Sequence, residues 1–262
     1  MLKRRLIFTL LYDQGYFMLS RNFRLQRVGD FNWLKTNYVF SNISLSIDEL
    51  IVLDVSRQNR DPYTFCEHLK RVSEDCFMPI AAGGGVRSIE DADRLLCSGA
   101  DKIVVNSPLY SNQDLIKSLA ERFGQQCIVA SIDIKRDTGN DYHMWVENGG
   151  RLLENNASFW LRKISKLPVG EIYLNSMDRD GTGQGYDLDI INNLPSHLHV
   201  PIILAGGAGN SRHLAQGLAD PRVDAVATAH LFNFVGDGLY QARRKLIAAG
   251  VELPIWSVWS EL

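Results

Sequence analysis

Two glycine-rich segments of the chain could bind phosphate. Gly83-Gly84-Gly85 and Gly206-Gly207 each follow a short apolar run and precede a helical pattern. Glycine lets backbone N–H groups come close to an anion, and a helix N-terminus adds partial positive charge. Asn106-Ser107 and Ala229-His230, at the end of the next apolar run in each case, would complete the two sites. A single segment of this kind could equally be a tight turn.

The spacing of these segments indicates an internal repeat. The glycine segments are 123 residues apart, and so are Asp101 and Asp224, which each precede the next apolar run. VLDVS at 52–56 and YLNSM at 173–177 are offset by 121 residues, and FTLLY at 8–12 matches SID at 131–133 at a similar offset. One shared register predicts two fused halves of four βα units each, with one phosphate site in each half. The predicted ligand therefore carries phosphates at both ends.

Short apolar runs that alternate with amphipathic stretches would position these residues. The runs are 6–11, 50–55, 79–83, 102–107, 127–133, 171–176, 201–206 and 225–229, and the helical stretches include 62–76, 89–100, 113–124, 158–167 and 239–250. This alternation is typical of a parallel sheet covered by helices. The length of 262 residues is close to the ~250 typical of a (β/α)8 barrel. We therefore predict one TIM-barrel domain over 1–262, made of two half-barrels, with its reacting groups at the carboxyl ends of the strands.

Two connections are too long for tight turns. They are 12–30, after the first strand, and 134–156, after the fifth. The second contains DTGNDYHMWVENGG, which predicts a β-hairpin inserted after strand five. The first is expected to be a loop whose segment 17–27 is aromatic and arginine-rich.

Composition and charge exclude several classes of protein. The formal net charge is −2, so no overall field would draw the chain to nucleic acid or a membrane. The sequence contains no run of ~18 uncharged apolar residues, which is the length needed to span a bilayer. The histidines show no metal-ligand spacing, and neither a metal nor a cofactor is expected. Four scattered cysteines favour buried free thiols in a reducing cytoplasm. The basic run Arg243–Lys245 is predicted to be a solvated helix face.

Four stretches resemble the cyclase subunit of imidazole glycerol phosphate synthase, an enzyme of histidine biosynthesis. They are PIAAGGGVRSIEDADRLLCSGADKIVVNS (79–107), FGQQCIVASIDIKR (123–136), SMDRDGTGQGYDL (176–188) and LAGGAG (204–209), and the resemblance extends over about 1–250. It implies a glutaminase partner whose ammonia passes through the barrel. At the mouth, ammonia joins a bisphosphorylated ribulosyl-formimino imidazole carboxamide nucleotide. The products are imidazole glycerol phosphate and an aminoimidazole carboxamide ribonucleotide.

The resemblance also assigns roles to individual residues at the barrel mouth. It implies that Asp133, at the end of strand five, is a general acid/base. The residues that it implies for the substrate and its two phosphates are Asp54, Gly84, Gly85, Asn106, Ser107, Asp180, Gly181, Thr182, Gly206, Gly207, Ala229 and His230.

At the opposite end of the barrel, the resemblance implies a charged ring that gates ammonia. Its members are Arg5, Glu49, Lys102 and Glu171. Each directly precedes an apolar strand and so lies at the barrel bottom, where two cations and two anions could neutralise one another. The alternative interpretation is a structural salt-bridge cluster without a passage. Asp101 and Gln126, on the same rim, would face the glutaminase.

The chain departs from the family pattern at several catalytic positions. The family has CLD at the end of strand one, and its aspartate is the second acid/base, but here the residues are Thr9-Leu10-Leu11. Loss of a positioned acid/base typically lowers a rate ~10²–10⁴-fold. Leu19 stands in place of a loop lysine, and His230 and Ala205 stand in place of serines. Asp13 is an alternative acid, although it is expected beyond the end of the first strand.

This selective pattern resembles the cyclase-like paralogues that accompany sugar amidotransferases in bacterial surface-polysaccharide biosynthesis. These systems combine a glutaminase, the barrel and a separate ATP-dependent amidotransferase, and turn an acetamido group on a nucleotide-linked sugar into an acetamidino group. We therefore expect a barrel that delivers ammonia for amidine formation. Two alternatives stay open: a cyclase of histidine biosynthesis, and a non-catalytic activator of the glutaminase.

Overall fold

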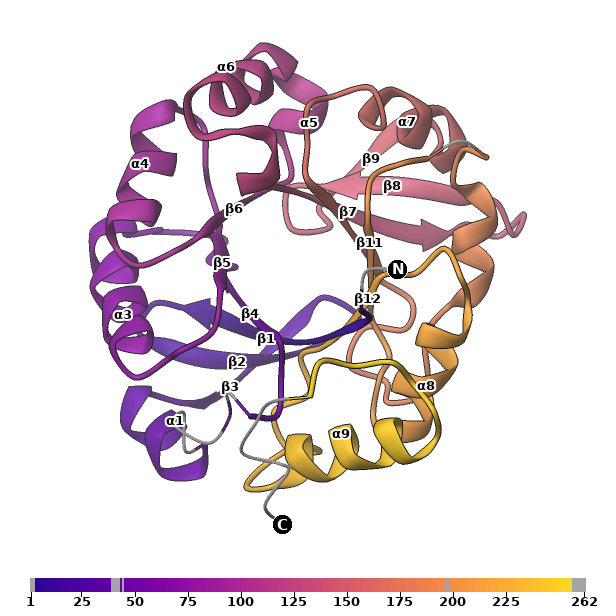
Figure 1. The fold of residues 1–262 in the computed structure, drawn as a ribbon. Helices are drawn as coiled ribbons and strands as arrows, with labels where there is room; N and C mark the ends of the chain where they lie inside the picture. Colours follow the sequence, from indigo (N-terminus) through magenta and orange to yellow (C-terminus); the bar gives the residue numbers. More distant parts are fainter. Residues whose placement is uncertain (1–2, 39–42, 44, 197, 256–262) are drawn as a thin grey trace.

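Eight parallel strands close into a barrel in the computed structural model, which describes residues 3–38, 43, 45–196 and 198–255. The barrel strands are β1 (Arg5–Asp13), β4 (Glu49–Asp54), β5 (Ile80–Gly83), β6 (Lys102–Val105), β7 (Ile128–Arg136), β10 (Glu171–Ser176), β11 (Ile202–Ala205) and β12 (Ala225–Thr228). Each pairs in parallel with its neighbour in this order, and β12 pairs with β1. Figure 1 shows the strands in a ring with helices outside it. The predicted TIM barrel is confirmed.

The helices cover the outside of the ring, and polar residues fix where several of them begin. They are α1 (Phe31–Asn37), α3 (Pro62–Glu74), α4 (Ile89–Cys97), α5 (Pro108–Ser111), α6 (Gln113–Phe123), α7 (Ala157–Ile164), α8 (Ser211–Ala219) and α9 (Gly238–Ala248), with 3₁₀ turns η1 (Gln125–Cys127) and η2 (Leu188–Asn193). Asp61 caps α3, whose first residue is Pro62, and Ser88 forms a capping box with Asp91 on α4. Of the described helices, none is long and apolar enough to cross a membrane.

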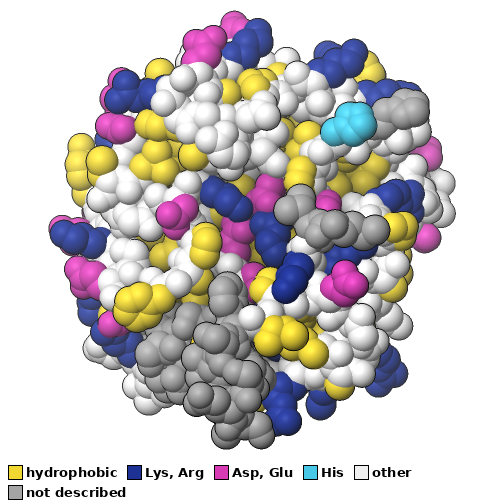
Figure 2. Space-filling view, viewed as in Figure 1, with side chains coloured by type: hydrophobic (Ala, Val, Ile, Leu, Met, Phe, Trp, Pro, Cys, Tyr) yellow, Lys and Arg dark blue, Asp and Glu magenta, His cyan; other side chains and the backbone are white. Residues whose placement is uncertain are grey.

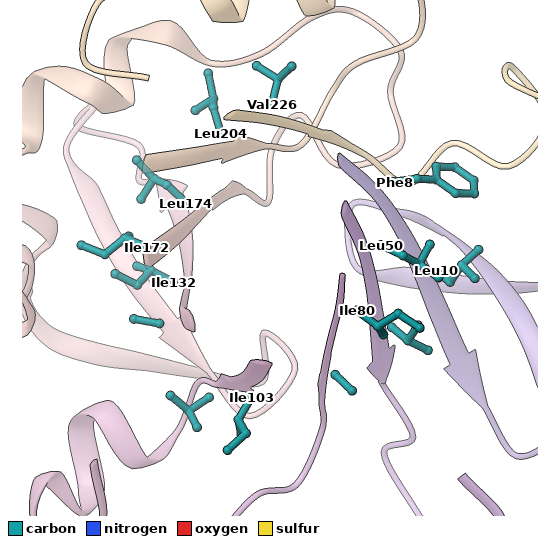
Figure 3. Packing of buried hydrophobic residues seen from close by; sticks show 14 of the residues in the cluster. Phe8, Leu10, Leu50, Ile80, Ile103, Ile132, Ile172, Leu174, Leu204 and Val226 are labelled. Atoms are coloured by element: carbon teal, nitrogen blue, oxygen red, sulfur yellow. The ribbon is translucent and has the colours of Figure 1, made fainter. Parts of the chain in front are cut away.

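Two apolar cores lie on the two sides of the strands. Side chains such as Phe8, Leu50 and Ile172 point away from the barrel axis and pack beneath the helices, as Figure 3 shows. Alternate residues such as Ile7, Ile51 and Val129 point inward and form a separate cluster in the lumen. This alternation follows from the two-residue period of a strand.

A repeated aspartate contact at the strand starts supports the half-barrel symmetry. The carboxylates of Asp48, Asp101 and Asp224 accept hydrogen bonds from the backbone N–H groups of Leu6, Ile80 and Ile202 respectively, at 2.8–2.9 Å. The fourth equivalent position is Gly170. A Cβ there would lie 2.7 Å from the Cα of Gln126, so the neighbouring backbone already fills the space.

Both long connections contain antiparallel strands. The predicted hairpin after strand five is confirmed as β8 (Tyr142–Val146) and β9 (Arg151–Asn156), and β8 pairs with β7. The first connection, expected to be a loop, is instead a hairpin of β2 (Tyr16–Arg21) and β3 (Arg24–Gly29), and β2 pairs with β1. Asn22 and Phe23 have φ of 50° and 62°, as a two-residue hairpin turn requires. No Asn-Gly signal marks this turn, because Phe23 stands where glycine is usual.

Three side-chain predictions are wrong. Arg243 is fully buried rather than solvated, and its guanidinium pairs with Asp48. Cys97 is exposed, because the buried face of α4 contains Ala92 and Leu95 on the other side of the helix. Cys127 is only half-buried, because it lies in η1 rather than inside the strand that follows.

Candidate functional site

A cavity of about 820 Å³ opens at the carboxyl ends of the barrel strands. This volume lies within the range of small-molecule sites. The predicted mouth residues that line the cavity are Asp54, Gly84, Gly85, Asn106, Ser107, Asp133, Asp180, Gly181, Gly206, Gly207, Ala229 and His230. Thr182 is not among the lining residues, because its hydroxyl donates to the carbonyl of Arg179 within its own loop.

Asp133 is a buried carboxylate held by two amides. Its Oδ1 accepts from Asn175 Nδ2 at 3.0 Å, and its Oδ2 accepts from Asn106 Nδ2 at 3.1 Å. The side chain is only 9% exposed, and burial raises the pKa of Asp133 to about 6. A group with that pKa can exchange a proton near neutral pH. Asn175, which fixes this geometry, was not identified from the sequence.

The first glycine segment lies beside an ion pair between a buried aspartate and a half-buried arginine. Gly84 and Gly85 have φ of 124° and 72°, a region that favours glycine, and a Cβ on Gly84 would meet the carbonyl oxygen of Asp54 at 2.3 Å. Asp54 pairs with Arg60 at 3.0 Å, and burial raises the pKa of this aspartate. A Cβ on Gly85 would lie 2.4 Å from Nη1 of Arg60. The guanidinium therefore stands directly behind the first phosphate site.

The second glycine segment lies in a neutral environment. Gly206 and Gly207 have φ of 87° and 107°, and a Cβ on Gly207 would lie 2.1 Å from the carbonyl oxygen of Gly185. Burial lowers the pKa of His230 and so disfavours the charged form of this imidazole. The second site thus has glycine backbone and polar groups, and among the described residues that line the cavity no lysine or arginine lies in its loops.

The four predicted ring residues meet at the opposite end of the barrel. Glu49 pairs with Arg5 and with Lys102 at 2.9 Å each, and Glu171 pairs with the same two cations. Glu49 is 2% exposed, and burial raises its pKa although Lys102 and Arg5 act against this. Figure 2 shows acidic and basic side chains together at the middle of this face. Asp101 and Gln126 lie exposed at the starts of β6 and β7, on the same side.

The lumen between the ring and the mouth is mainly apolar among the described residues, and Thr9, Ser131 and Tyr173 add hydroxyl groups to it. Small side chains, among them Ala81, Ala205 and Ala227, contribute to its inner cluster. Tyr173 belongs to this cluster and also lines the cavity, and its hydroxyl lies 3.3 Å from that of Thr9. This pair lies between the charged ring and Asp133.

Comparison with known proteins identifies the family. A protein from Parasynechococcus marenigrum (strain WH8102), provisionally named imidazole glycerol phosphate synthase subunit hisF2, is 49% identical over 245 residues, 94% of this chain and 91% of that protein. Imidazole glycerol phosphate synthase subunit HisF of Pelodictyon phaeoclathratiforme is 39% identical over 208 residues, 79% and 82% of the two chains. The subunit HisF of Streptococcus sanguinis is 34% identical over 256 residues, 97% and 100% of the two chains. The family described as "Histidine biosynthesis protein" matches residues 39–236. This chain belongs to the HisF family.

In this HisF-family chain, Leu11 lines the cavity where the family pattern has an aspartate. The prediction that Asp13 lies beyond the first strand is wrong. Asp13 is the last residue of β1, because β1 continues into the hairpin with β2. It lines an adjoining hollow, which shares Phe23 and Arg57 with the mouth cavity, and does not line the mouth cavity itself. The geometry therefore gives no support to Asp13 as a replacement for the missing acid.

The β2–β3 hairpin folds over the mouth of the barrel and is fastened to the loop after β10. The Asp180 carboxylate accepts from the Ser20 hydroxyl and, at 2.9 Å, from the backbone N–H of Phe23. The side-chain amide of Asn22 donates to the carbonyls of Met177 and Asp178. A Cβ on Gly181 would lie 1.8 Å from the carbonyl oxygen of Ser20, which explains the glycine. Asp180 thus holds the hairpin in place as well as lining the cavity.

Sequence reasoning missed the arginines of the mouth. Arg57, Arg60, Arg87 and Arg151 all line the cavity. The first two follow the carboxyl end of β4 within six residues, and Arg87 follows Gly85 by two. Their position directly after barrel strands was an available signal, because βα loops form the mouth of such barrels.

Proposed function

We propose that this chain receives ammonia from a glutaminase at the ring face and delivers it at the mouth, where an acetamido group on a nucleotide-linked sugar becomes an acetamidino group. The contrast between the two barrel ends carries the proposal. In the charged ring, each of the two cations pairs with both glutamates. At the mouth, Leu11 occupies the position where closure of an imidazole ring needs an acid. A chain that keeps the entrance for ammonia and lacks one of two proton-transfer groups is better suited to supply ammonia than to close an imidazole ring.

Amidine formation replaces the amide oxygen of the acetamido group by nitrogen. A separate amidotransferase would activate that oxygen with ATP, after which ammonia attacks the carbon and the activated oxygen leaves. The attacking nitrogen must lose a proton. Asp133, with a pKa of about 6, is mostly ionised at neutral pH and could take up this proton at the mouth. The setting we propose is surface-polysaccharide biosynthesis in the cytoplasm.

Two other functions make different predictions. A histidine-pathway cyclase, favoured by the names of the relatives and by the retained Asp133, would turn over the bisphosphorylated nucleotide with ammonium alone. A non-catalytic activator would stimulate the glutaminase equally well with Asp133→Asn, because no chemistry would occur at the mouth.

The partner is tested by mixing the purified chain with its cognate glutaminase. We expect co-elution in size-exclusion chromatography and weaker association for Asp101→Lys. Because Asp101 also accepts from the N–H of Ile80 at 2.8 Å, Asp101→Asn serves as the matched variant that removes the charge and retains an acceptor. A glutaminase that never co-elutes with the wild-type chain would overturn the proposal.

The reaction is tested with the complex, the amidotransferase, ATP and glutamine labelled with ¹⁵N in its amide group. We expect the label in the acetamidino product, at a higher yield than an equal concentration of free ammonium gives. Equal incorporation from both sources would show that the barrel delivers nothing.

A further inference from the structure

Three of the four arginines that line the mouth come from the half-barrel that contains the first glycine segment. Arg57 and Arg60 follow β4, Arg87 follows the glycines after β5, and Arg151 begins β9. Arg60 lies against Gly85, and Nη2 of Arg57 donates to the carbonyl of Phe23 at the tip of the β2–β3 hairpin. Among the described residues, no carboxylate pairs with Arg57 or Arg87, whereas Arg60 pairs with Asp54 and Arg151 with Glu147.

Among the described residues that line the cavity, no lysine or arginine belongs to the loops after β11 and β12, which contain the second glycine segment and His230. Gly206, Gly207 and Ala229 present backbone, and burial disfavours the charged form of His230. The β-carbon of Arg179 lies near Gly207, but Arg179 does not line the cavity. A second phosphate group here would meet neutral donors and the N-terminus of α8 (Ser211–Ala219) but, among the described residues, no arginine that lines the cavity.

The helix beside the first site does not replace the arginines. The backbone N–H groups of Arg87 and Ser88 both donate to the Asp91 carboxylate in the capping box of α4. Glu90 and Asp91 place two negative charges in the first turn of this helix. They offset the partial positive charge that a helix N-terminus offers an anion. Charge complementarity to an anion at this site must therefore come mainly from the arginines.

We propose that the mouth binds a nucleoside diphosphate, with its diphosphate on the arginine half and an uncharged sugar toward His230. The two adjacent phosphates of a diphosphate hold most of the ligand's negative charge. They would lie beside Arg57 and Arg87, which pair with no carboxylate among the described residues. A ligand with phosphates at both ends would instead place one dianion in the neutral half. Asn175, Ser131 and the Tyr173 hydroxyl line the cavity near Asp133 and supply uncharged polar groups for a sugar. The inference that the ligand contains a sugar rests on the proposed function. The inference that it contains a diphosphate rests on the arginines of the mouth.

Calorimetric titration of the isolated chain tests this inference with four probes: uridine diphosphate, uridine monophosphate, pyrophosphate and fructose 1,6-bisphosphate. We expect uridine diphosphate to bind at least ~10-fold more tightly than the monophosphate and than fructose 1,6-bisphosphate, whose phosphates are far apart, because charge-assisted contacts to adjacent phosphates are the strong ones. Equal or tighter binding of fructose 1,6-bisphosphate, or no binding of either diphosphate, would overturn the inference.

Arg87→Gln should weaken binding of uridine diphosphate ~10-fold or more without changing the thermal midpoint of unfolding, because Arg87 is exposed and outside any described ion pair. The matched control is Arg212→Gln, an exposed arginine of α8 that does not line the cavity. An unchanged affinity for Arg87→Gln, or an equal loss for Arg212→Gln, would contradict the assignment. No glutaminase or ammonia is present in this assay. Diphosphate binding can therefore succeed when amidine formation fails. If amidine forms but no diphosphate binds, only the present inference is overturned.

Discussion

Leu11 and Asp133 occupy equivalent positions in the two half-barrels, and both line the same cavity. Leu11 pairs with Leu53 between β1 and β4, and Asp133 pairs with Asn175 between β7 and β10, at an offset of 122 residues in both strands. Asp133 and Asn175 are hydrogen-bonded to each other, whereas the equivalent pair consists of two leucines. One half of the mouth can exchange a proton through its strand-end pair, and the other half cannot.

Little or no cyclase turnover is expected with the histidine-pathway nucleotide and ammonium. Ring closure needs one group to take a proton and another to supply one, and Leu11 can do neither. Leu11→Asp is expected not to restore the activity, because Leu19 also replaces the loop lysine. The measurement is a turnover assay with ammonium salt, which needs no glutaminase. A wild-type rate of ~1 s⁻¹ or more, typical of enzymes, would establish the cyclase alternative instead.

Asp133 is expected to make the stability of the fold depend on pH. An acid whose pKa is raised in the folded state binds its proton more tightly there, so folding gains stability as the pH falls through about 6 toward the unfolded value near 4. Urea unfolding at pH 7.5 and pH 4.5 should show the wild type gaining ~1–3 kcal/mol relative to Asp133→Asn at the lower pH. The same difference between the two proteins at both pH values would contradict the raised pKa.

Lys102→Ala should change ammonia transfer more than it changes stability. The lysine joins the Glu49 and Glu171 carboxylates at 2.9 Å each, and its side chain is 20% exposed at the opening of the lumen. The expected loss of stability is ~1–3 kcal/mol, as for a buried polar group that loses one partner, because Arg5 still pairs with both glutamates. The ratio of product formed to glutamine hydrolysed should change several-fold. A ratio that stays constant would favour the structural salt-bridge interpretation of the ring.

Arg243→Met should destabilise the barrel by ~3–5 kcal/mol, because it leaves the buried Asp48 carboxylate without its cation. Two guanidinium nitrogens of Arg243 contact the two oxygens of Asp48 at 2.9 Å, and Arg243 is 0% exposed. Arg244→Met, at the exposed neighbouring position, is the matched control and should stay within ~0.5 kcal/mol of the wild type. Urea unfolding measures both variants, and similar values for the two would show that the buried pair contributes nothing.

Asp180→Ala should release the β2–β3 hairpin from the mouth. The carboxylate accepts from the Ser20 hydroxyl and from the N–H of Phe23, and the variant loses both bonds while the Asn22 bonds to Met177 and Asp178 remain. Local opening exposes backbone to protease, so trypsin should cleave after Arg21 or Arg24 several-fold faster than in the wild type. Asp178→Ala is the control, because the Asp178 carboxylate accepts from the N–H of Arg136 and does not contact the hairpin. Equal cleavage of both variants would show that Asp180 does not fasten the hairpin.

The sequence by itself determined the barrel and most of its mouth. Apolar strands and amphipathic helices are patterns that short stretches of sequence contain. The repeated glycine segments mark places where the backbone has positive φ and passes close to a neighbouring segment. Parallel strands of a barrel bring their carboxyl ends together, so residues such as Asp133 and Asn106 could be placed at one mouth without coordinates.

Only the tertiary structure decided which side chains meet across the chain. The contacts between Ser20 and Asp180 and between Arg243 and Asp48 join residues 160 and 195 positions apart. No local period predicts such contacts, because an arginine in a helical pattern looks the same whether it is buried or solvated. Position after barrel strands could place Arg57, Arg60 and Arg87 at the mouth, but only folding brings the loops side by side, so that their charges add to one field and their ion pairs are decided.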